Sequence, residues 1–474
     1  MKIAIIGSGI SGLSSAYHLS KLTKKLGVDA EIDVIEKNNV PGGTISTIKE
    51  NGFTMEQGAD SFITSKPWAL EMCKEIGLEA KLVPISTNDR RCFVYFDGKL
   101  KALPDGFFLT APSDLNSFRK SDFFAAEEKE RILYEQQVTV KKTGEEESVD
   151  EFVKRRFGNA LLEKAAKPLI GGIYTGDTKK LSASCVLPEF VSMEKKFGSV
   201  IRGLQEKYSL LKTESGARYG LFLSLQGGMS TLINGLVKAT KGVNFNYNQE
   251  VVSIHRKDGK WNLTDNKEKE RLFDALILTV PSHTASELTK NIDARLSDTL
   301  KKISSASSIV ANIAVSKKDL ANFPEGVGIV VPPSEKMNIL ACSFTSRKFL
   351  ATSKKGYELI RCFAGGVLNP DLPYKNETEI TDLLIGELKL ILRTDIKPSF
   401  IKTKKYFNAM PQYNLGHSNL IKTINHRTED LGTVAVAGNA YDGIGIPDCI
   451  KSGQKAAEII LTSVTRINDQ NTSA

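Results

Sequence analysis

The glycine turn GSGISG at Gly7–Gly12 constrains the fold more than any other feature of the sequence. It follows the apolar run Lys2–Ile6, and the residues after it predict a helix from Leu13 to about Lys25. A second strand is expected at Glu31–Glu36, which completes the pattern of one βαβ unit. Because the N-terminal end of a helix attracts anions, we expect this turn to hold the pyrophosphate of a dinucleotide.

Each glycine of the turn has an expected role. Gly7 allows the tight turn, Gly9 lets the backbone approach the pyrophosphate, and Gly12 lets the helix pack closely on the strand. Glu36 ends the second strand, where its carboxylate can accept hydrogen bonds from both ribose hydroxyls and would repel a 2′-phosphate. The alternative, a glycine turn without a ligand, fits the strand–turn–helix context less well. The expected cofactor contacts in this unit are Gly7, Ser8, Gly9, Ile10, Ser11, Gly12, Glu36 and Lys37.

A second glycine pair indicates which dinucleotide is bound. Gly42 and Gly43, in EKNNVPGGTIST, resemble the pair that approaches the FAD phosphates in the two-dinucleotide-binding flavoprotein superfamily. The resemblance implies FAD as the cofactor, with Thr44 beside the pair. The chain has no second GxGxxG that follows a strand, which reductases that take electrons from NAD(P)H usually carry. This absence favours an oxidase.

The C-terminal segment AGNAYDGIGIPDCIKSG resembles the closing motif of the same superfamily. A strand is expected to end at Gly438, and a helix is expected to begin near Pro447–Asp448. The N-terminus of that helix can stabilise negative charge on reduced flavin. An αβ turn with Asp448 as a capping charge is the alternative, and it is compatible with this role. The residues expected beside the flavin ring are Ile444, Gly445 and Ile446.

The length of 474 residues and the apolar content of 41% suit two or three domains. We expect an α/β fold in which a Rossmann-like FAD-binding domain is built from residues 1–88, 216–290 and 425–465. A mainly helical insertion is expected at 89–215, and a mixed α+β substrate domain at 291–424. The six cysteines form no CxxC pair, so no metal site is indicated. The glycines and serines after Lys2 favour the nucleotide turn over a signal peptide, so we expect a cytoplasmic protein.

Five further segments resemble signatures of the protoporphyrinogen/coproporphyrinogen oxidase family of haem biosynthesis. The resemblance extends over nearly the whole chain, and amine oxidases and carotenoid desaturases share only its first and last motifs. The segments are MEQGADSF (Met55–Phe62), KPLIGGIYTGDTKKLSA (Lys167–Ala183), SLQGGMSTL (Ser224–Leu232), AMPQYNLGHSNLI (Ala409–Ile421) and the closing GIGIPDCI.

The family resemblance implies roles for further residues. Tyr406 matches an aromatic position in contact with the flavin, although the family often has Trp there. Val251 matches the position whose backbone meets the adenine. The register places either Arg91 or Cys92 at a position that pairs with a substrate propionate, and Arg91 has the charge for this contact. Gly172 and Ile173 are expected near the substrate. The residues expected along the FAD are Gly58, Ala59, Asp60 and Ser61.

The implied reaction is the six-electron oxidation of coproporphyrinogen III to coproporphyrin III, with oxygen as acceptor and three H2O2 released. Protoporphyrinogen IX is the alternative substrate, and the motifs do not decide between the two. His417 and His283 are candidate proton-handling groups, although a role in ordering a loop is favoured for a histidine in a Gly-His turn. The resemblance further suggests transient contact with ferrochelatase and, through Gly106–Pro112, contact with the inner face of a membrane.

Two rival classes are open at this point. A flavin amine oxidase would show an acidic pocket for polyamines, and a porphyrin carrier would bind without turnover. The net charge of +9 is a mild excess, with basic residues dispersed among acidic ones. No nucleic-acid partner is therefore expected.

Overall fold

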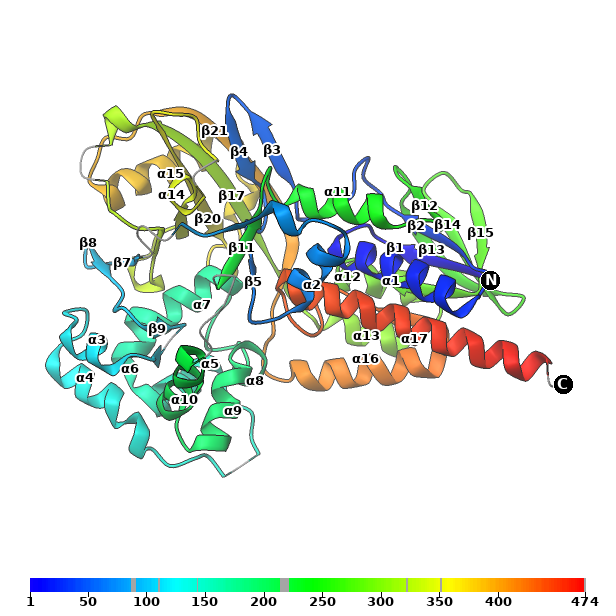
Figure 1. The fold of residues 1–474 in the computed structure, drawn as a ribbon, viewed down its shortest axis with the longest axis horizontal. Helices are drawn as coiled ribbons and strands as arrows, with labels where there is room; N and C mark the ends of the chain where they lie inside the picture. Colours follow the sequence, from blue (N-terminus) through cyan, green and yellow to red (C-terminus); the bar gives the residue numbers. More distant parts are fainter. Residues whose placement is uncertain are drawn as a thin grey trace.

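The protein is described from a computed structural model. The structure describes residues 1–86, 91–109, 111–142, 144–213, 221–320, 323–349 and 352–472. Figure 1 shows three parts: a parallel sheet with its helices beside the N-terminus, a second sheet with β17, β20 and β21, and a group of helices below that sheet.

The first part is a five-stranded parallel sheet. All five strands run in the same direction, so their carboxyl ends lie at one edge of the sheet. Its order is β12 (Val243–Asn246), β2 (Glu31–Ile35), β1 (Lys2–Ile6), β16 (Ala275–Leu278) and β22 (Val434–Val436). Alternate residues of β1 face opposite layers and all of them beyond Lys2 are buried, as a sheet covered on both faces requires. The α/β prediction with a Rossmann-like domain is confirmed.

Helices α1 (Ile10–Leu26) and α17 (Ile446–Thr472) cover one face of this sheet (Figure 1). Their apolar stripes bury Ile3 and Ile5 of β1. Ala4 and Ile6 face the other layer. That layer contains β13 (Val251–Lys257), β14 (Lys260–Asp265), β15 (Glu270–Phe273), α12 (Ser282–Thr289), α13 (Ala294–Lys301) and α16 (His417–Leu431).

The second part is a seven-stranded mixed sheet covered on one face by α15 (Glu377–Leu392). Strand β17 lies inside this sheet, where it pairs with β20 on one side and with β21 on the other. The strand order is β21 (Pro398–Pro411), β17 (Ser305–Ser316), β20 (Tyr357–Gly365), β19 (Ile339–Phe344), β18 (Gly328–Val330), β7 (Cys92–Phe96) and β8 (Lys99–Ala102).

The third part is helical and has its own core, built largely from phenylalanine and leucine side chains. Its helices are α3 (Leu115–Lys120), α4 (Ala126–Leu133), α5 (Val149–Phe157), α6 (Asn159–Leu161), α7 (Lys167–Tyr174), α8 (Ala183–Val186), α9 (Pro188–Phe197) and α10 (Val200–Thr213). Short strands connect the parts: β3 (Thr47–Glu50), β4 (Phe53–Glu56), β5 (Phe62–Ile63), β6 (Leu82–Pro84), β9 (Phe107–Phe108), β10 (Ala111–Pro112) and β11 (Phe222–Leu225).

Two local expectations differ from the structure. The segment expected to be mainly helical begins with two strands, β7 and β8, which belong to the seven-stranded sheet. Strand β7 pairs in parallel with β18, more than 200 residues further along the chain, and a local sequence pattern carries no record of such a partner. The strand-like run Phe245–Ile254 (FNYNQEVVSI) predicts one strand, but the structure divides it between β12 and β13, which lie in different sheets.

Candidate functional site

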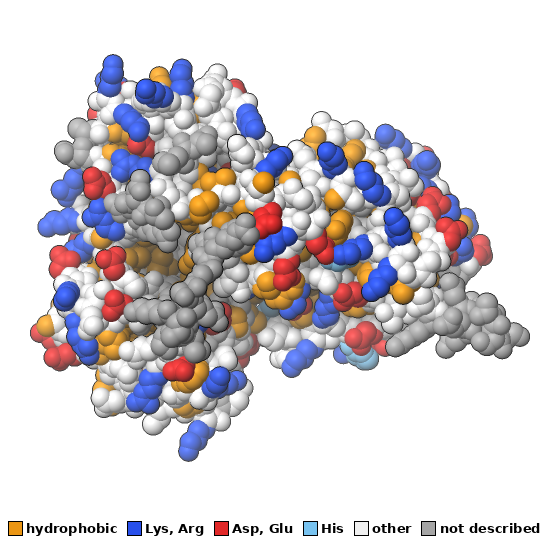
Figure 2. All heavy atoms as spheres, in the orientation of Figure 1, with side chains coloured by type: hydrophobic (Ala, Val, Ile, Leu, Met, Phe, Trp, Pro, Cys, Tyr) orange, Lys and Arg blue, Asp and Glu red, His pale blue; other side chains and the backbone are white. Residues whose placement is uncertain are grey.

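A cavity of about 1250 Å³ lies where the three parts meet, at the carboxyl ends of the parallel strands. Residues that directly follow β1, β2, β16 and β22 line one end of it, and residues from β21 and α7 line the other. Figure 2 shows hydrophobic side chains gathered in the hollow between the seven-stranded sheet and the helical part. Pockets for one small ligand measure about 300–1,000 Å³, so this cavity has room for a cofactor and a substrate.

The glycine turn forms the floor of the cavity at the start of α1. A side chain at Gly12 would place its Cβ 2.0 Å from the Gly7 carbonyl oxygen, so the helix can approach the strand only because residue 12 is glycine. A Cβ at Gly9 would meet no atom within 4 Å. The space above Gly9 is therefore open, and the first turn of α1 directs its free N–H groups toward it, which suits a pyrophosphate.

The Glu36 side chain lies at the end of β2 and is buried. One carboxylate oxygen accepts hydrogen bonds from the Ser8 backbone N–H (2.8 Å) and the Ser8 hydroxyl (2.9 Å). The other oxygen accepts from the Asn38 backbone N–H (2.9 Å) and the Asn38 side-chain amide (2.7 Å). The hydroxyl and the amide can rotate away, which would free acceptor positions for a ribose diol. The acceptor oxygens of Glu36 and the open space above Gly9 together fit the ribose and the pyrophosphate of a dinucleotide.

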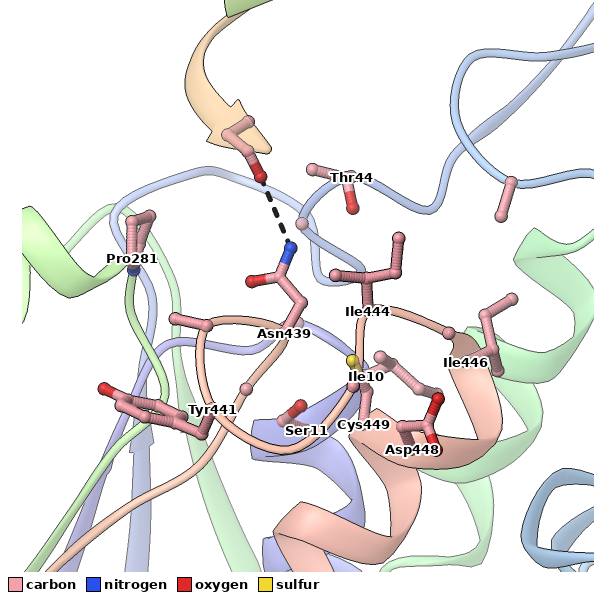
Figure 3. A pocket seen from close by; sticks show the side chains of 18 of the residues that line it. Ile10, Ser11, Thr44, Pro281, Asn439, Tyr441, Ile444, Ile446, Asp448 and Cys449 are labelled. Atoms are coloured by element: carbon pink, nitrogen blue, oxygen red, sulfur yellow. Dashed lines mark hydrogen bonds between the residues drawn. The ribbon is translucent and has the colours of Figure 1, made fainter. Parts of the chain in front are cut away.

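The closing motif forms a loop across the cavity between β22 and α17. Gly443 has φ 132° and lies against Asp448, so a Cβ there would be 2.4 Å from the Asp448 carboxyl carbon. Asp448 itself is in the first turn of α17 and pairs with Lys66 at 2.8 Å. In Figure 3 Ile444 and Ile446 lie on the side of the loop that faces Thr44, and the Asn439 amide donates to the Ala409 carbonyl at 3.3 Å.

The remaining walls are mainly apolar, and lysine side chains of β21 lie among their residues. Strand β21 contributes Lys404, Lys405, Tyr406 and Phe407, and the Tyr406 hydroxyl donates to the Thr44 carbonyl at 3.4 Å. The helical part contributes apolar side chains, namely Phe108, Leu109, Ile170, Ile173, Tyr174, Val186, Leu187 and Phe190.

Most of the residues predicted from the sequence as cofactor contacts meet at this cavity. Ser8, Gly12, Gly58 and Asp60 do not line it and lie behind residues that do. Gly58 packs so closely that a Cβ there would be 1.9 Å from the Thr44 carbonyl oxygen. The residues that line it are Gly7, Gly9, Ile10, Ser11, Glu36, Lys37, Gly42, Gly43, Thr44, Ala59, Ser61, Val251, Tyr406, Ile444, Gly445 and Ile446.

The predicted substrate contacts are only partly brought together. Ile173 lines the cavity, whereas Gly172 faces Ala341 and Val330. Arg91 does not reach the cavity, which corrects the expected propionate contact. It precedes β7, accepts a backbone hydrogen bond from Val327 and pairs with Glu325 at 3.2 Å, because the pairing of β7 with β18 directs it to the outside of the sheet.

The apolar residues of Gly106–Pro112 mainly pack inside the protein. Thr110 lies outside the described residues. Phe107 and Phe108 pack against the helical core, and Phe108 also lines the cavity. Leu109 is 38% exposed and lines the cavity as well.

Burial favours the neutral form of both candidate histidines. Burial lowers the pKa of His417, which stacks on the Tyr413 ring with centroids 4.1 Å apart. Its Nε2 contacts the Tyr441 carbonyl oxygen at 3.2 Å, so this histidine orders the closing loop as well as lining the cavity. Burial, and then the charge of Lys37, lower the pKa of His283, which does not line the cavity.

Tyr413 is a functional residue that sequence reasoning left without a role, although it stands in the PQY signature. Its hydroxyl donates to the Asn439 carbonyl (2.7 Å) and accepts from the Gly443 N–H (2.8 Å), so it joins both ends of the closing loop. Burial holds the pKa of Tyr413 well above its usual value, which keeps the hydroxyl protonated and able to donate.

Glu56 is a buried carboxyl behind the cavity, and its protonation is expected to show in the stability of the protein. It accepts hydrogen bonds from the Met229 N–H and the Thr47 hydroxyl, but burial dominates and raises its pKa to about 7 from 4.5. The folded state therefore binds this proton more tightly than the unfolded state does. Stability from Glu56 is present below about pH 4.5 and is lost as the pH rises to about 7.

We expect the Glu56→Gln variant to lack this loss, because glutamine copies the protonated carboxyl. Relative to the variant, the wild type should lose about 2.5 kcal/mol of unfolding free energy between about pH 5 and pH 8. Denaturant unfolding at both pH values measures the difference, in which the histidine contributions cancel. Parallel pH dependences in the two proteins would contradict the raised pKa.

Comparison with known proteins agrees with this geometry. The family model for flavin-containing amine oxidoreductases matches residues 10–461, so the chain belongs to this family of flavin-dependent oxidoreductases. Within the family, it is 30% identical over 471 residues to the coproporphyrinogen III oxidase of Staphylococcus aureus, covering 98% of this chain and 99% of that one. It is 28% identical to the coproporphyrinogen III oxidase of Bacillus subtilis, covering 97% of this chain and 98% of that one.

A solved structure has the same fold over almost the entire chain. The crystal structure of an Exiguobacterium protein described as a protoporphyrinogen oxidase superposes with a TM-score of 0.84 at 26% identity. The match covers 97% of this chain and 98% of that one. The predicted resemblance to porphyrinogen oxidases is thereby confirmed.

Within the described residues, no helix combines the length and the apolar character that crossing a membrane requires. The same residues contain no group of three or more His, Cys, Asp or Glu side chains arranged to hold a metal ion.

Proposed function

We propose that this protein is an FAD-dependent oxidase that converts coproporphyrinogen III into coproporphyrin III, with oxygen as the electron acceptor. The observation that carries the proposal is the continuity of one cavity from the dinucleotide cradle at Gly9 to an apolar chamber edged by Lys404 and Lys405. The names of the Staphylococcus aureus and Bacillus subtilis relatives support this choice of substrate.

The residues of the chain bind and orient the reactants in this proposal. When bound, FAD supplies the two-electron acceptor chemistry. The N-terminus of α1 and Glu36 would hold the adenosine diphosphate part, and Thr44 and the closing loop would hold the ring. Phe108, Ile170 and the other apolar side chains exclude water and pack against the tetrapyrrole, which gives the alignment that redox transfer requires.

The cationic edge favours a substrate that carries carboxylates over a polyamine. Lys404 lies beside the Tyr406 ring, with its ammonium 6.0 Å from the centroid, and the Lys405 ammonium donates to the Lys375 carbonyl. Both lysines line the cavity and leave N–H donors for propionate groups. This charge disfavours the amine-oxidase alternative, whose substrates are cations.

Protoporphyrinogen IX is the second candidate, as the name of the Exiguobacterium protein suggests. Purified protein should be yellow, and it should raise porphyrin fluorescence and hydrogen peroxide together when coproporphyrinogen III is added in air. We expect the specificity constant for coproporphyrinogen III to exceed that for protoporphyrinogen IX by about tenfold, or about 1.4 kcal/mol. A tenfold preference in the other direction would overturn the choice of substrate, and a yellow protein inert toward both would overturn the proposed reaction.

A further inference from the structure

The face of the seven-stranded sheet that points away from α15 buries a row of polar side chains. Asn312 of β17 lies directly opposite Arg361 of β20, which in turn lies opposite Ser343 of β19. Asn312 is fully buried and Arg361 is 3% exposed. On the other face, the alternating residues Ile360 and Cys362 pack in the apolar core against α15. These polar side chains therefore point away from the apolar core between the sheet and α15.

The partner of this row is the segment from Glu56 to Ser61. Asp60 is 5% exposed and pairs with two cations of the second part, Lys348 at 2.8 Å and Arg361 at 3.0 Å. Arg361 also donates to the Gly58 carbonyl at 3.2 Å. The Asn312 amide donates to the Glu56 carbonyl at 3.1 Å. Two side chains of the sheet, Asn312 and Arg361, therefore hold this short segment together with Lys348, which ends the neighbouring helix α14 (Thr345–Lys348).

The segment that carries Asp60 and the sheet that carries Arg361 each contribute residues to the cavity wall. Ala59 and Ser61, on either side of Asp60, line the cavity on the side of the cofactor cradle. The sheet that carries Arg361 also carries β21, whose residues 404–407 form the opposite wall. The ion pairs of Asp60 with Lys348 and Arg361, here called the Asp60 clamp, therefore join two walls of one cavity.

The ion pairs of the Asp60 clamp are not expected to add much to the stability of the fold. Removing three charges from water is costly, and apolar side chains of similar volume often serve a core as well or better. The Arg361 Nε is buried without a hydrogen-bond partner among the described residues, so the cluster is not even fully satisfied. A directional ion pair gives what an apolar contact does not, which is a fixed separation and orientation of the parts it joins.

We propose that Asp60, Lys348 and Arg361 are positioning residues that set the separation between the flavin-side wall and β21, and thereby align the substrate against the flavin. This inference rests on the proposed porphyrinogen oxidase function. None of the three residues lines the cavity, so they act through Ala59, Ser61 and β21.

Arg361→Met tests the clamp, because methionine keeps much of the length and leaves the Asp60–Lys348 pair intact. A matched control is Arg427→Met, which breaks a pair with the buried Asp293 (2.9 Å from the Arg427 Nε), and neither residue of this pair lines the cavity. Both variants are compared with wild type for thermal unfolding midpoint, visible circular dichroism of the bound flavin, and anaerobic flavin reduction by coproporphyrinogen III. We expect Arg361→Met to alter the dichroism and to slow reduction per bound flavin by about tenfold to hundredfold, as misalignment does.

A double variant separates alignment from stability. Asp60→Asn leaves the buried Arg361 and the partly exposed Lys348 without their carboxylate partner, and adding Arg361→Met removes one of these two cations. The double variant should unfold at a higher temperature than Asp60→Asn, yet remain as slow in flavin reduction. Reduction that recovers with stability, or an Arg361→Met rate within about twofold of the control, would overturn the positioning role.

The dichroism spectrum distinguishes failure of the clamp from failure of the proposed function. If wild type does not react with either porphyrinogen, the proposed reaction fails and the spectrum still reports the flavin environment. A spectrum changed in Arg361→Met and unchanged in Arg427→Met then supports the clamp. Identical spectra in all three proteins overturn it.

Discussion

Gly12→Ala is expected to lose its flavin together with a large part of its stability. The new Cβ would lie 2.0 Å from the Gly7 carbonyl oxygen and 2.7 Å from the Thr279 hydroxyl. The nearer atom belongs to the backbone of the turn, so α1 itself would have to move away from β1. Overpacking of this kind costs about 1–3 kcal/mol and occasionally more, and it would distort the cradle directly. Flavin absorbance per protein and the thermal unfolding midpoint measure both effects.

Gly9→Ala is the matched control, because its Cβ meets no protein atom within 4 Å and the residue has an ordinary φ of −65°. We expect a normal unfolding midpoint of the flavin-free protein. The methyl group would occupy the space assigned to the pyrophosphate, so FAD affinity should fall by at least about tenfold, or about 1.4 kcal/mol. Full flavin content in Gly9→Ala would show that the dinucleotide does not bind above this turn.

Tyr413→Phe is expected to weaken FAD binding while the protein stays folded. The substitution leaves the Gly443 N–H and the Asn439 carbonyl without the hydroxyl that joins them. An unsatisfied buried polar group costs about 1–3 kcal/mol, and the loop that would hold the flavin ring bears this cost. We expect the FAD dissociation constant to rise by about tenfold to hundredfold, measured by flavin fluorescence on release.

Tyr441→Phe provides the control within the same loop. The Tyr441 hydroxyl is buried and has no hydrogen-bond partner among the described residues, so its removal should leave FAD affinity and stability unchanged or slightly improved. Equal losses in the two variants would mean that the hydroxyl of Tyr413 has no special part in holding the loop.

The PQY segment also contacts the segment Lys167–Ala183, so two of the signatures found in the sequence meet in the structure. The Tyr413 carbonyl accepts a hydrogen bond from the Ser182 N–H at 2.8 Å, and Asn414 forms a β-bridge with Leu181. The Glu146 carboxylate accepts from the Gly416 N–H at 2.6 Å. The helical part therefore holds the PQY segment, and the PQY segment holds the closing loop. A shift of the substrate-side helices would reach the flavin-side loop along this route.

The cofactor cradle could be predicted from the sequence because its determinants are local. The spacing of Gly7, Gly9 and Gly12 between a strand and a helix allows one backbone path, and Glu36 follows at the end of the next strand. The continuous apolar run Lys2–Ile6 likewise indicates a strand that is buried on both faces. Such patterns depend on residues a few positions apart in the chain, so the sequence alone is enough to predict them.

Only the tertiary structure decided the rest of the site. Asp60 meets Lys348, 288 residues further along the chain, and Tyr413 reaches a loop 26 to 30 residues away that belongs to another part. Arg91 was misplaced for the same reason, because the pairing of β7 with β18 determines where it points. These contacts depend on how the sheets and helices pack against one another, and a polar side chain carries no local sign of its distant partner. The sequence by itself determined the cradle, whereas the packing of the three parts determined the cavity walls, the Asp60 clamp and the hydrogen bonds of Tyr413 to the closing loop.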